Sequence, residues 1–222
     1  MTEPIRLAVF DMAGTTVHDG GTVEASFAEA MVAVGAEADD DAVRYVRETM
    51  GMSKIEVFRH LLGRDEARAQ SANKAFEAAY GRRLAAGQAV PVEGAVELFA
   101  DLRAAGTKVC LTTGFSSATQ EALVAALGWQ RAVDLWLAPG PGRRGRPYPD
   151  LVLGALLALQ VDDVRSVAAA GDTANDLVAA HRAGAAVVAG VLTGAHDRDQ
   201  LEAAPHTHVL ASVADLRPIL LP

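Results

Sequence analysis

The chain of 222 residues contains 50% hydrophobic and 22% charged residues, which is typical of a globular protein and not of a disordered one. Its net charge of −8 argues against a nucleic-acid-binding function, because no basic surface offsets the acidic residues. The single cysteine, Cys110, excludes an internal disulfide, and no apolar stretch is long enough for a membrane span. We therefore expect a cytoplasmic protein with neither a nucleic-acid nor a membrane partner.

Helical periodicity dominates the chain from residue 22 to about residue 87. A buried strand is expected first, at residues 5–10. Three helical patterns then end at Gly35, near Met50 and at Gly63, and a long fourth one covers residues 65–86. No strand pattern interrupts them, so this segment is predicted to be all-helical.

After Pro91 the pattern changes to alternating strands and helices. Strands are expected at residues 108–112, 133–138, 164–170, 186–191 and 208–211, and helices at 93–105, 118–127, 148–159 and 174–183. Such alternation predicts a doubly wound parallel sheet. The strand at residues 5–10 finds partners only after Pro91. We therefore predict an α/β fold with a Rossmann-like core, residues 1–20 and 91–222, and an all-helical cap domain, residues 21–90, inserted after the first strand.

Four polar clusters directly follow expected strands, where open α/β sheets bind their ligands. The first begins at Asp11, which is placed as an exposed nucleophile. Enzymes that transfer phosphoryl groups to an aspartate usually carry a second Asp two positions on, as a general acid/base, and here that position is Ala13. The other three clusters cover residues 112–116, 145–149 and 171–176.

These clusters offer groups suited to phosphoryl chemistry. The hydroxyl of Thr113 and the amide of Gly114 can donate to phosphate oxygens, and Arg146 can neutralise phosphate charge. Asp172 and Asp176, four residues apart on a turn into a helix, offer the oxygen ligands that Mg²⁺ prefers. The sequence therefore indicates a phosphoryl-transfer site.

Each cluster taken alone also has a structural interpretation. An Asp after a strand is often a turn residue or helix cap, and a lone arginine is often a solvated surface charge. The order of nucleophile, hydroxyl, cation and carboxylate pair along one sheet favours the functional interpretation.

With these motifs the chain resembles the haloacid dehalogenase superfamily, and within it phosphonatase (phosphonoacetaldehyde hydrolase) and the phosphonatase-like hydrolases. Three motifs carry the resemblance: Asp-x-Ala-Gly-Thr at residues 11–15, Gly-Arg-Pro-Tyr-Pro at residues 145–149, and Met-Gly-x-x-Lys at residues 50–54. The last one places a Schiff-base lysine, Lys54, in the cap.

The resemblance implies a Mg²⁺-dependent hydrolase that cleaves the P–C bond of phosphonoacetaldehyde or a close carbonyl phosphonate. Asp11 would form the aspartyl-phosphate and Lys54 the imine that accepts the electrons of the breaking bond, so that the carbon group departs as an enamine. The implied site residues are as follows: Asp11, Lys54, Thr113 and Arg146 for catalysis; Met50, Gly51, Thr113, Gly114 and Arg146 for substrate binding; and Asp11, the Ala13 carbonyl, Asp172 and Asp176 for the metal, with Asp176 acting through water or by orienting Asp172.

Two departures from phosphonatase bear on proton transfer. The histidine expected three residues after the lysine is Val57, with His60 the nearest alternative, and Phe115 stands where an aromatic hydroxyl is expected. A phosphatase acting on a small phosphate monoester or activated phosphate therefore stays open, as does a phosphate-sensing protein without catalysis. Lys54 also has a structural interpretation as an exposed helix lysine.

The helical segment also raises the question of a second chain. Apolar residues at helical spacing, Phe27, Met31 and Val34, can pack within the cap or against another copy, so a homodimer formed through the cap is possible.

Overall fold

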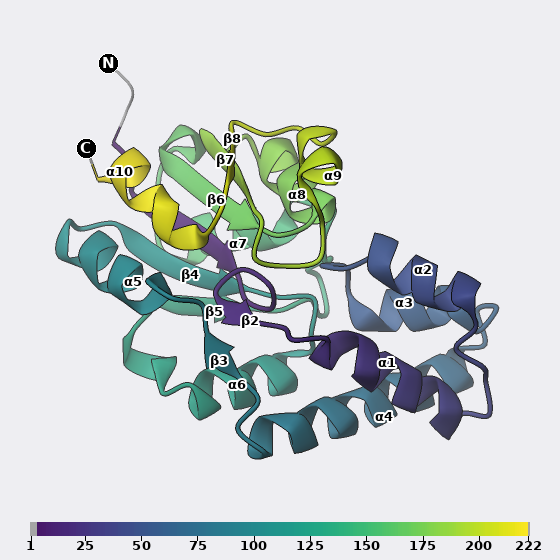
Figure 1. The fold of residues 1–222 in the computed structure, drawn as a ribbon. Helices are drawn as coiled ribbons and strands as arrows, with labels where there is room; N and C mark the ends of the chain where they lie inside the picture. Colours follow the sequence, from purple (N-terminus) through teal and green to yellow (C-terminus); the bar gives the residue numbers. More distant parts are fainter. Residues whose placement is uncertain (1–3, 222) are drawn as a thin grey trace.

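The structure, a computed structural model, describes residues 4–221 and contains a six-stranded parallel sheet. Its strand order is β5-β4-β1-β6-β7-β8, with β1 in the middle (Figure 1). The strands are β1 (Leu7–Asp11), β4 (Lys108–Thr112), β5 (Leu135–Leu137), β6 (Val167–Gly171), β7 (Val187–Val191) and β8 (His208–Leu210). The predicted Rossmann-like fold is confirmed, and the strands lie where the sequence placed them to within three residues.

The largest shift concerns β6, which begins at Val167 and not at residue 164. The carboxylate of Asp163 accepts a hydrogen bond from the Arg165 amide and starts a 3-10 turn over Val164–Ser166. The apolar pattern from residue 164 onward thus includes a turn that precedes the strand.

Alternate residues of β1 contribute to two separate hydrophobic cores. Ala8 and Phe10 belong to the first, and Leu7 and Val9 to the second. The first core contains side chains of α5 (Ala95–Ala104), α6 (Ser117–Ala126) and α10 (Arg217–Leu220), and the second contains side chains of α7 (Asp150–Ala158), α8 (Ala174–Ala183) and α9 (Arg198–Glu202). The central strand is therefore covered on both faces, which holds its carboxyl end in a rigid position.

Four helices lie between the first and the next strand of this sheet, and form a group to one side of it (Figure 1). They are α1 (Thr22–Ala33), α2 (Asp40–Glu48), α3 (Lys54–Leu61) and α4 (Glu66–Ala85). The chain enters and leaves this group through a short antiparallel pair, β2 (Val17–His18) with β3 (Val90–Pro91). Two-residue strands are too short to give a sequence pattern. The division at residues 20 and 91 remains a proposal, and the position of this pair at both crossings agrees with it.

An aromatic cluster connects the four helices to the sheet. Phe27 lies 4.7 Å from Phe58 and 4.9 Å from Phe76 between ring centroids, and Tyr80 lies 4.6 Å from Phe115, which follows β4. Phe27 and Met31 are buried inside the cap. A homodimer through the cap remains a proposal. Among residues 4–221, no helix is long and apolar enough to cross a membrane.

Candidate active site

The first three site residues come together because parallel strands end at the same edge. Asp11 is the last residue of β1 and is directly paired in register with Thr112, the last residue of β4. Asp172 follows β6, the neighbour of β1 on its other side. Asp11 and Asp172 are both buried, with 5% and 3% of their surface exposed. The edge thus holds two carboxylates with little exposed surface, and Asp11 is not the exposed side chain that the sequence predicted.

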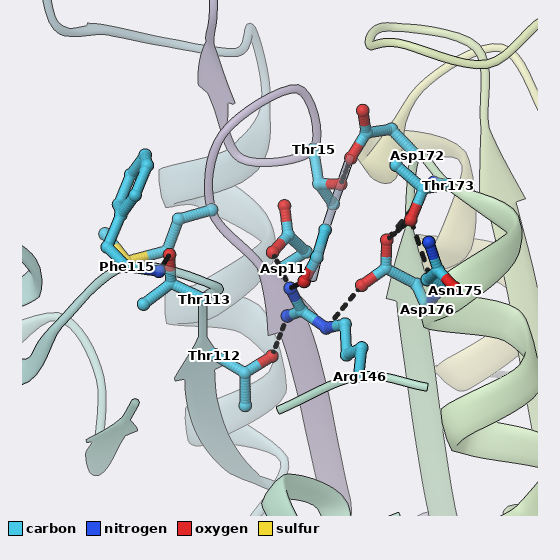
Figure 2. Close-up of polar contacts among 12 residues, drawn as sticks. Asp11, Thr15, Thr112, Thr113, Phe115, Arg146, Asp172, Thr173, Asn175 and Asp176 are labelled. Atoms are coloured by element: carbon cyan, nitrogen blue, oxygen red, sulfur yellow. Dashed lines mark hydrogen bonds and ion pairs between the residues drawn. The ribbon is translucent and has the colours of Figure 1, made fainter. Parts of the chain in front are cut away.

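The guanidinium of Arg146 lies between Asp11, Thr112 and Asp176 (Figure 2). Its Nη1 is 2.7 Å from Oδ1 of Asp11, and its Nε is 2.6 Å from Oδ1 of Asp176. Its Nη2 donates to the Thr112 hydroxyl at 2.6 Å. Because all three partners lie in the protein interior, Arg146 is fixed beside the proposed nucleophile.

The Asp172 carboxylate is enclosed by hydrogen-bond donors and close backbone. It accepts from the Thr15 hydroxyl at 3.1 Å and from the Ala195 amide at 2.7 Å. A Cβ at Gly14 or Gly194 would lie 2.3 or 2.0 Å from Asp172 Oδ2, so only glycine allows this approach. Burial, with a further contribution from Asp176, raises the pKa of Asp172 to about 7. Burial likewise raises the pKa of Asp11 well above its usual range, although Arg146 opposes the rise.

The donor set fits a hard cation. Asp11 and Asp172 are buried, their charges repel each other, and a divalent ion relieves both costs. Residues 4–221 contain no group of three or more His, Cys, Asp and Glu side chains placed to hold a metal. Mg²⁺, however, uses one or two carboxylates with waters and substrate oxygens. The Ala13 residue lines the same cavity as both carboxylates.

Asp176 makes contacts that differ from those of an open metal ligand. Its Oδ1 pairs with Arg146, and its Oδ2 accepts from the Thr173 hydroxyl at 2.5 Å as part of the capping box of α8. Direct metal ligation by Asp176 stays a prediction, and these contacts favour an orienting role.

The cap contributes to the site through the loop of residues 50–54, which ends at Lys54. Asn175 donates its side-chain amide to the Met50 carbonyl at 3.0 Å, and the Lys54 amide donates to the Gly114 carbonyl at 3.1 Å. Gly51, at φ 82°, sits so close to the core that a Cβ would lie 2.6 Å from the Thr173 hydroxyl. The loop is therefore seated tightly on the carboxyl edge of the sheet.

Lys54 is the first residue of α3, and its side chain is buried, with 6% of its surface exposed. Its Nζ lies 5.7 Å from the ring centroid of Phe27 and 5.4 Å from that of Phe115. Within residues 4–221, no carboxylate lies within ion-pair distance of Nζ. Burial lowers the pKa of Lys54 to about 8, while Asp11 and Asp19 oppose the fall. The interpretation as a solvent-exposed helix lysine is wrong.

Lys54 and the carboxylates of the sheet edge share one cavity of about 360 Å³. The predicted site residues that line it are Asp11, Ala13, Met50, Gly51, Lys54, Thr113, Gly114 and Asp172. Arg146 and Asp176 do not line it and are buried next to Asp11. The Thr113 hydroxyl accepts from the Phe115 amide at 3.1 Å.

The structure also shows where two residues lie that bear on the histidine expected from phosphonatase. Val57 is buried, and His60 stacks on Tyr45 with centroids 4.0 Å apart, outside this cavity. His60 therefore does not replace the expected histidine.

Several residues of the site were not singled out from the sequence. Thr112, Thr15 and Asn175 lie beside predicted residues and hold Arg146, Asp172 and the cap loop in place. Their position inside the recognised motifs was the available signal. Asp19 and Arg47, which also line the cavity, carried no motif.

Comparisons with known proteins agree with this geometry. A family model described as haloacid dehalogenase-like hydrolase matches residues 5–184. A probable phosphatase IndB of Dickeya dadantii is 30% identical over 89% of this chain and 86% of that protein. A phosphonoacetaldehyde hydrolase of Nitratidesulfovibrio vulgaris is 31% identical over 86% of this chain and 73% of that protein.

Among solved structures, a phosphonoacetaldehyde hydrolase-like protein from Oleispira antarctica superposes with a TM-score of 0.85 at 26% identity. The match covers 99% of this chain and 92% of that one. The chain belongs to the haloacid dehalogenase-like hydrolases, in the branch that includes the phosphonoacetaldehyde hydrolases and their relatives.

Proposed function

We propose that this hydrolase cleaves the P–C bond of phosphonoacetaldehyde, or of a close carbonyl phosphonate, to give phosphate and an aldehyde. One observation carries the proposal: Lys54 is buried without an ion-pair partner among the described residues, in the same cavity as Asp11. A lysine with a pKa of about 8 has a substantial neutral fraction near physiological pH, as imine formation requires.

The groups divide the chemistry between them. Lys54 attacks the carbonyl carbon and, after loss of water, forms an imine next to the phosphonate carbon. Asp11 attacks phosphorus, the P–C electron pair moves into the imine, and the carbon group leaves as an enamine. A proton then adds to the enamine carbon and regenerates the imine. Water hydrolyses this imine to the aldehyde and free Lys54, and hydrolyses the aspartyl-phosphate to phosphate and free Asp11. Arg146, held by Thr112 and Asp176, stabilises the charge on Asp11 from behind the cavity.

Haloacid dehalogenase-like hydrolases generally use Mg²⁺. In this chain, Asp11, Asp172 and the Ala13 carbonyl would hold it. When bound, the ion neutralises charge that develops on the phosphoryl oxygens.

A phosphatase is the second candidate, and it is favoured by the similarity to IndB and by Val57 and His60, which leave the expected histidine unreplaced. Ala13 restricts that activity to phosphates with good leaving groups, because no carboxylic acid stands there to protonate an alkoxide.

The experiment is phosphate release from phosphonoacetaldehyde with Mg²⁺, measured for the native protein and for Lys54→Arg, with acetyl phosphate as a second substrate. We expect phosphonoacetaldehyde turnover that Lys54→Arg lowers by about 10³-fold or more, since arginine forms no imine. Hydrolysis of acetyl phosphate alone, unaffected by Lys54→Arg, would instead identify a phosphatase.

A further inference from the structure

The connection into the cap adds a further carboxyl group, Asp19, to the cavity that Lys54 lines. Asp19 follows β2 and precedes α1, and it lines the same cavity as Asp11 and Lys54. Its Oδ1 accepts a hydrogen bond from the Val23 amide at 3.1 Å. The charges of Asp19 and Lys54 act on each other across the cavity.

The surroundings of Asp19 favour proton exchange. Partial burial raises its pKa above the ordinary value, Lys54 on α3 opposes the rise, and Glu24 on α1 adds to it. The Asp19 charge also acts on Tyr80 of α4. Asp19 thus holds a proton more readily than an exposed aspartate does.

The other candidates for proton transfer near Lys54 are absent or engaged. Ala13, Val57 and Phe115 carry no titratable group. Of the other acidic or imidazole groups that line the cavity, Asp11 and Asp172 are assigned to phosphorus and the metal.

The two remaining groups are less suitable. Glu24 accepts hydrogen bonds from Nε and Nη2 of Arg47, at 2.7 and 3.0 Å, and His18 is exposed. Among the described residues that line the cavity, Asp19 is therefore the carboxyl that remains available to Lys54.

We propose that Asp19 is the acid–base group for formation and hydrolysis of the Lys54 imine. The inference rests on the proposed P–C hydrolase function. The Asp19 carboxylate takes a proton from the Lys54 ammonium through intervening water. The neutral amine then adds to the carbonyl carbon. One proton of its nitrogen passes to the former carbonyl oxygen, which gives a carbinolamine. Asp19 returns its proton to the departing hydroxyl, so water leaves and a protonated imine and a carboxylate remain. Imine hydrolysis reverses these steps.

A purely structural role for Asp19 is distinguishable from this one. Asp19 accepts a hydrogen bond from the Val23 amide near the start of α1, whose N-cap residue is Gly21, and the side-chain oxygen of asparagine can accept the same bond. Asp19→Asn therefore removes proton transfer and preserves this hydrogen bond. Asp39→Asn is the matched control, because Asp39 caps α2 by accepting from the Ala42 amide at 2.8 Å outside the cavity.

The test is the rate at which phosphonoacetaldehyde forms a borohydride-reducible adduct on Lys54, followed by mass spectrometry of quenched samples. Asp19→Asn should slow adduct formation near pH 7 by about a hundredfold, within the usual range for general acid–base catalysis. Asp39→Asn should match the native protein.

The pH dependence gives a second readout. In the native protein the rate should change little with pH below about 8 as long as Asp19 is ionised and Lys54 is protonated, because the two groups then share one proton. In Asp19→Asn it should rise about tenfold per pH unit until Lys54 is neutral, because only the neutral amine reacts. The rise should end at a pKa below about 8, because the Asp19 charge no longer opposes the fall of the Lys54 pKa.

Three results would overturn the inference. An unchanged rate in Asp19→Asn would remove Asp19 from the mechanism and leave the proposed function intact. A hundredfold loss in His18→Gln, with Asp19→Asn as fast as the native protein, would transfer the role to His18. Absence of any adduct on the native protein would overturn the P–C hydrolase proposal and the role of Asp19 together.

Discussion

The carboxyl edge of the sheet and the cap loop of residues 50–54 line one cavity, but the buried charges are paired at the edge and, within residues 4–221, unpaired in the loop. At the edge of the sheet, charged groups are buried in contact with partners, as Arg146 is between Asp11 and Asp176. In the cap, the Lys54 ammonium is buried over two aromatic rings with no partner at ion-pair distance among the described residues.

The difference indicates what each region contributes. A paired site binds and stabilises an anion with little reorganisation, which suits phosphoryl transfer. An unpaired, desolvated amine is costly to keep charged, so a larger fraction of it is neutral near physiological pH. Only this neutral form attacks a carbonyl carbon. Asp11 belongs to the edge of the sheet and Lys54 to the cap. The contact between cap and core therefore decides whether these two side chains can act on one substrate.

Removal of the nucleophile should have the largest effect and should affect every substrate. Asp11→Asn keeps the side-chain shape but removes the attacking carboxylate, so we expect turnover to fall by roughly 10⁴-fold or more for both phosphonoacetaldehyde and acetyl phosphate. Phosphate release measures this. Residual turnover within tenfold of the native rate would show that the edge of the sheet acts without Asp11.

Burial of Lys54 without a charged partner in the described part of the chain should lower the free energy of unfolding. A fall of the Lys54 pKa from 10.5 to about 8 corresponds to about 3 kcal/mol. Below pH 8 the lysine is charged in both folded and unfolded states and the full penalty applies, whereas near pH 10.5 and above the penalty vanishes.

Lys54→Met should therefore raise the free energy of unfolding by up to about 3 kcal/mol at pH 7, with a gain that shrinks as the pH rises past 8. Urea unfolding at several pH values measures it. Lys74→Met, at an exposed position on α4, is the control. An equal gain in both variants, or one independent of pH, would contradict the cost assigned to Lys54.

The seating of the cap loop should be sensitive to one methyl group. A Cβ at Gly114 would lie 2.2 Å from the Met52 carbonyl oxygen, so Gly114→Ala must displace the loop that carries Lys54. We expect kcat/KM for phosphonoacetaldehyde to fall by about tenfold to a hundredfold. Gly81→Ala, in a helix with open space around it, is the matched control. Equal activity in the two variants would show that close seating of the loop is dispensable.

A single hydrogen bond between cap and core should give the smallest effect. Asn175→Ala removes the donor to the Met50 carbonyl, a loss of about 1 kcal/mol, or roughly fivefold in kcat/KM. Asn73→Ala, which removes a bond to Glu77 within α4, should leave steady-state kinetics unchanged. An Asn175→Ala variant indistinguishable from Asn73→Ala would show that this bond does not position the loop.

Much of the fold was predictable because its signals are local. The alternation of apolar strands and helices after Pro91 defined the parallel sheet, and the position of Asp11 and Asp172 directly after strands placed them at one edge. The β2–β3 pair was not predictable, because two-residue strands leave no periodicity and their pairing joins residues far apart in sequence.

The site was predictable where a motif marked it and not where packing made it. Lys54 was recognised from its motif, but its burial depends on Phe27 and Phe115, which come from other segments of the chain. Asp19 gave no signal, because its relation to Lys54 exists only after α1 and α3 pack together. The pairing of Asp176 with Arg146 likewise depends on tertiary contact.

The most direct measurement is borohydride reduction of the native protein during turnover of phosphonoacetaldehyde with Mg²⁺, followed by peptide mass spectrometry. The proposed mechanism predicts a two-carbon adduct on Lys54, with or without its phosphonate group, that is absent in Lys54→Arg and absent without substrate. Phosphate release from phosphonoacetaldehyde with no adduct on Lys54 would contradict it, because the P–C bond would then break without the imine.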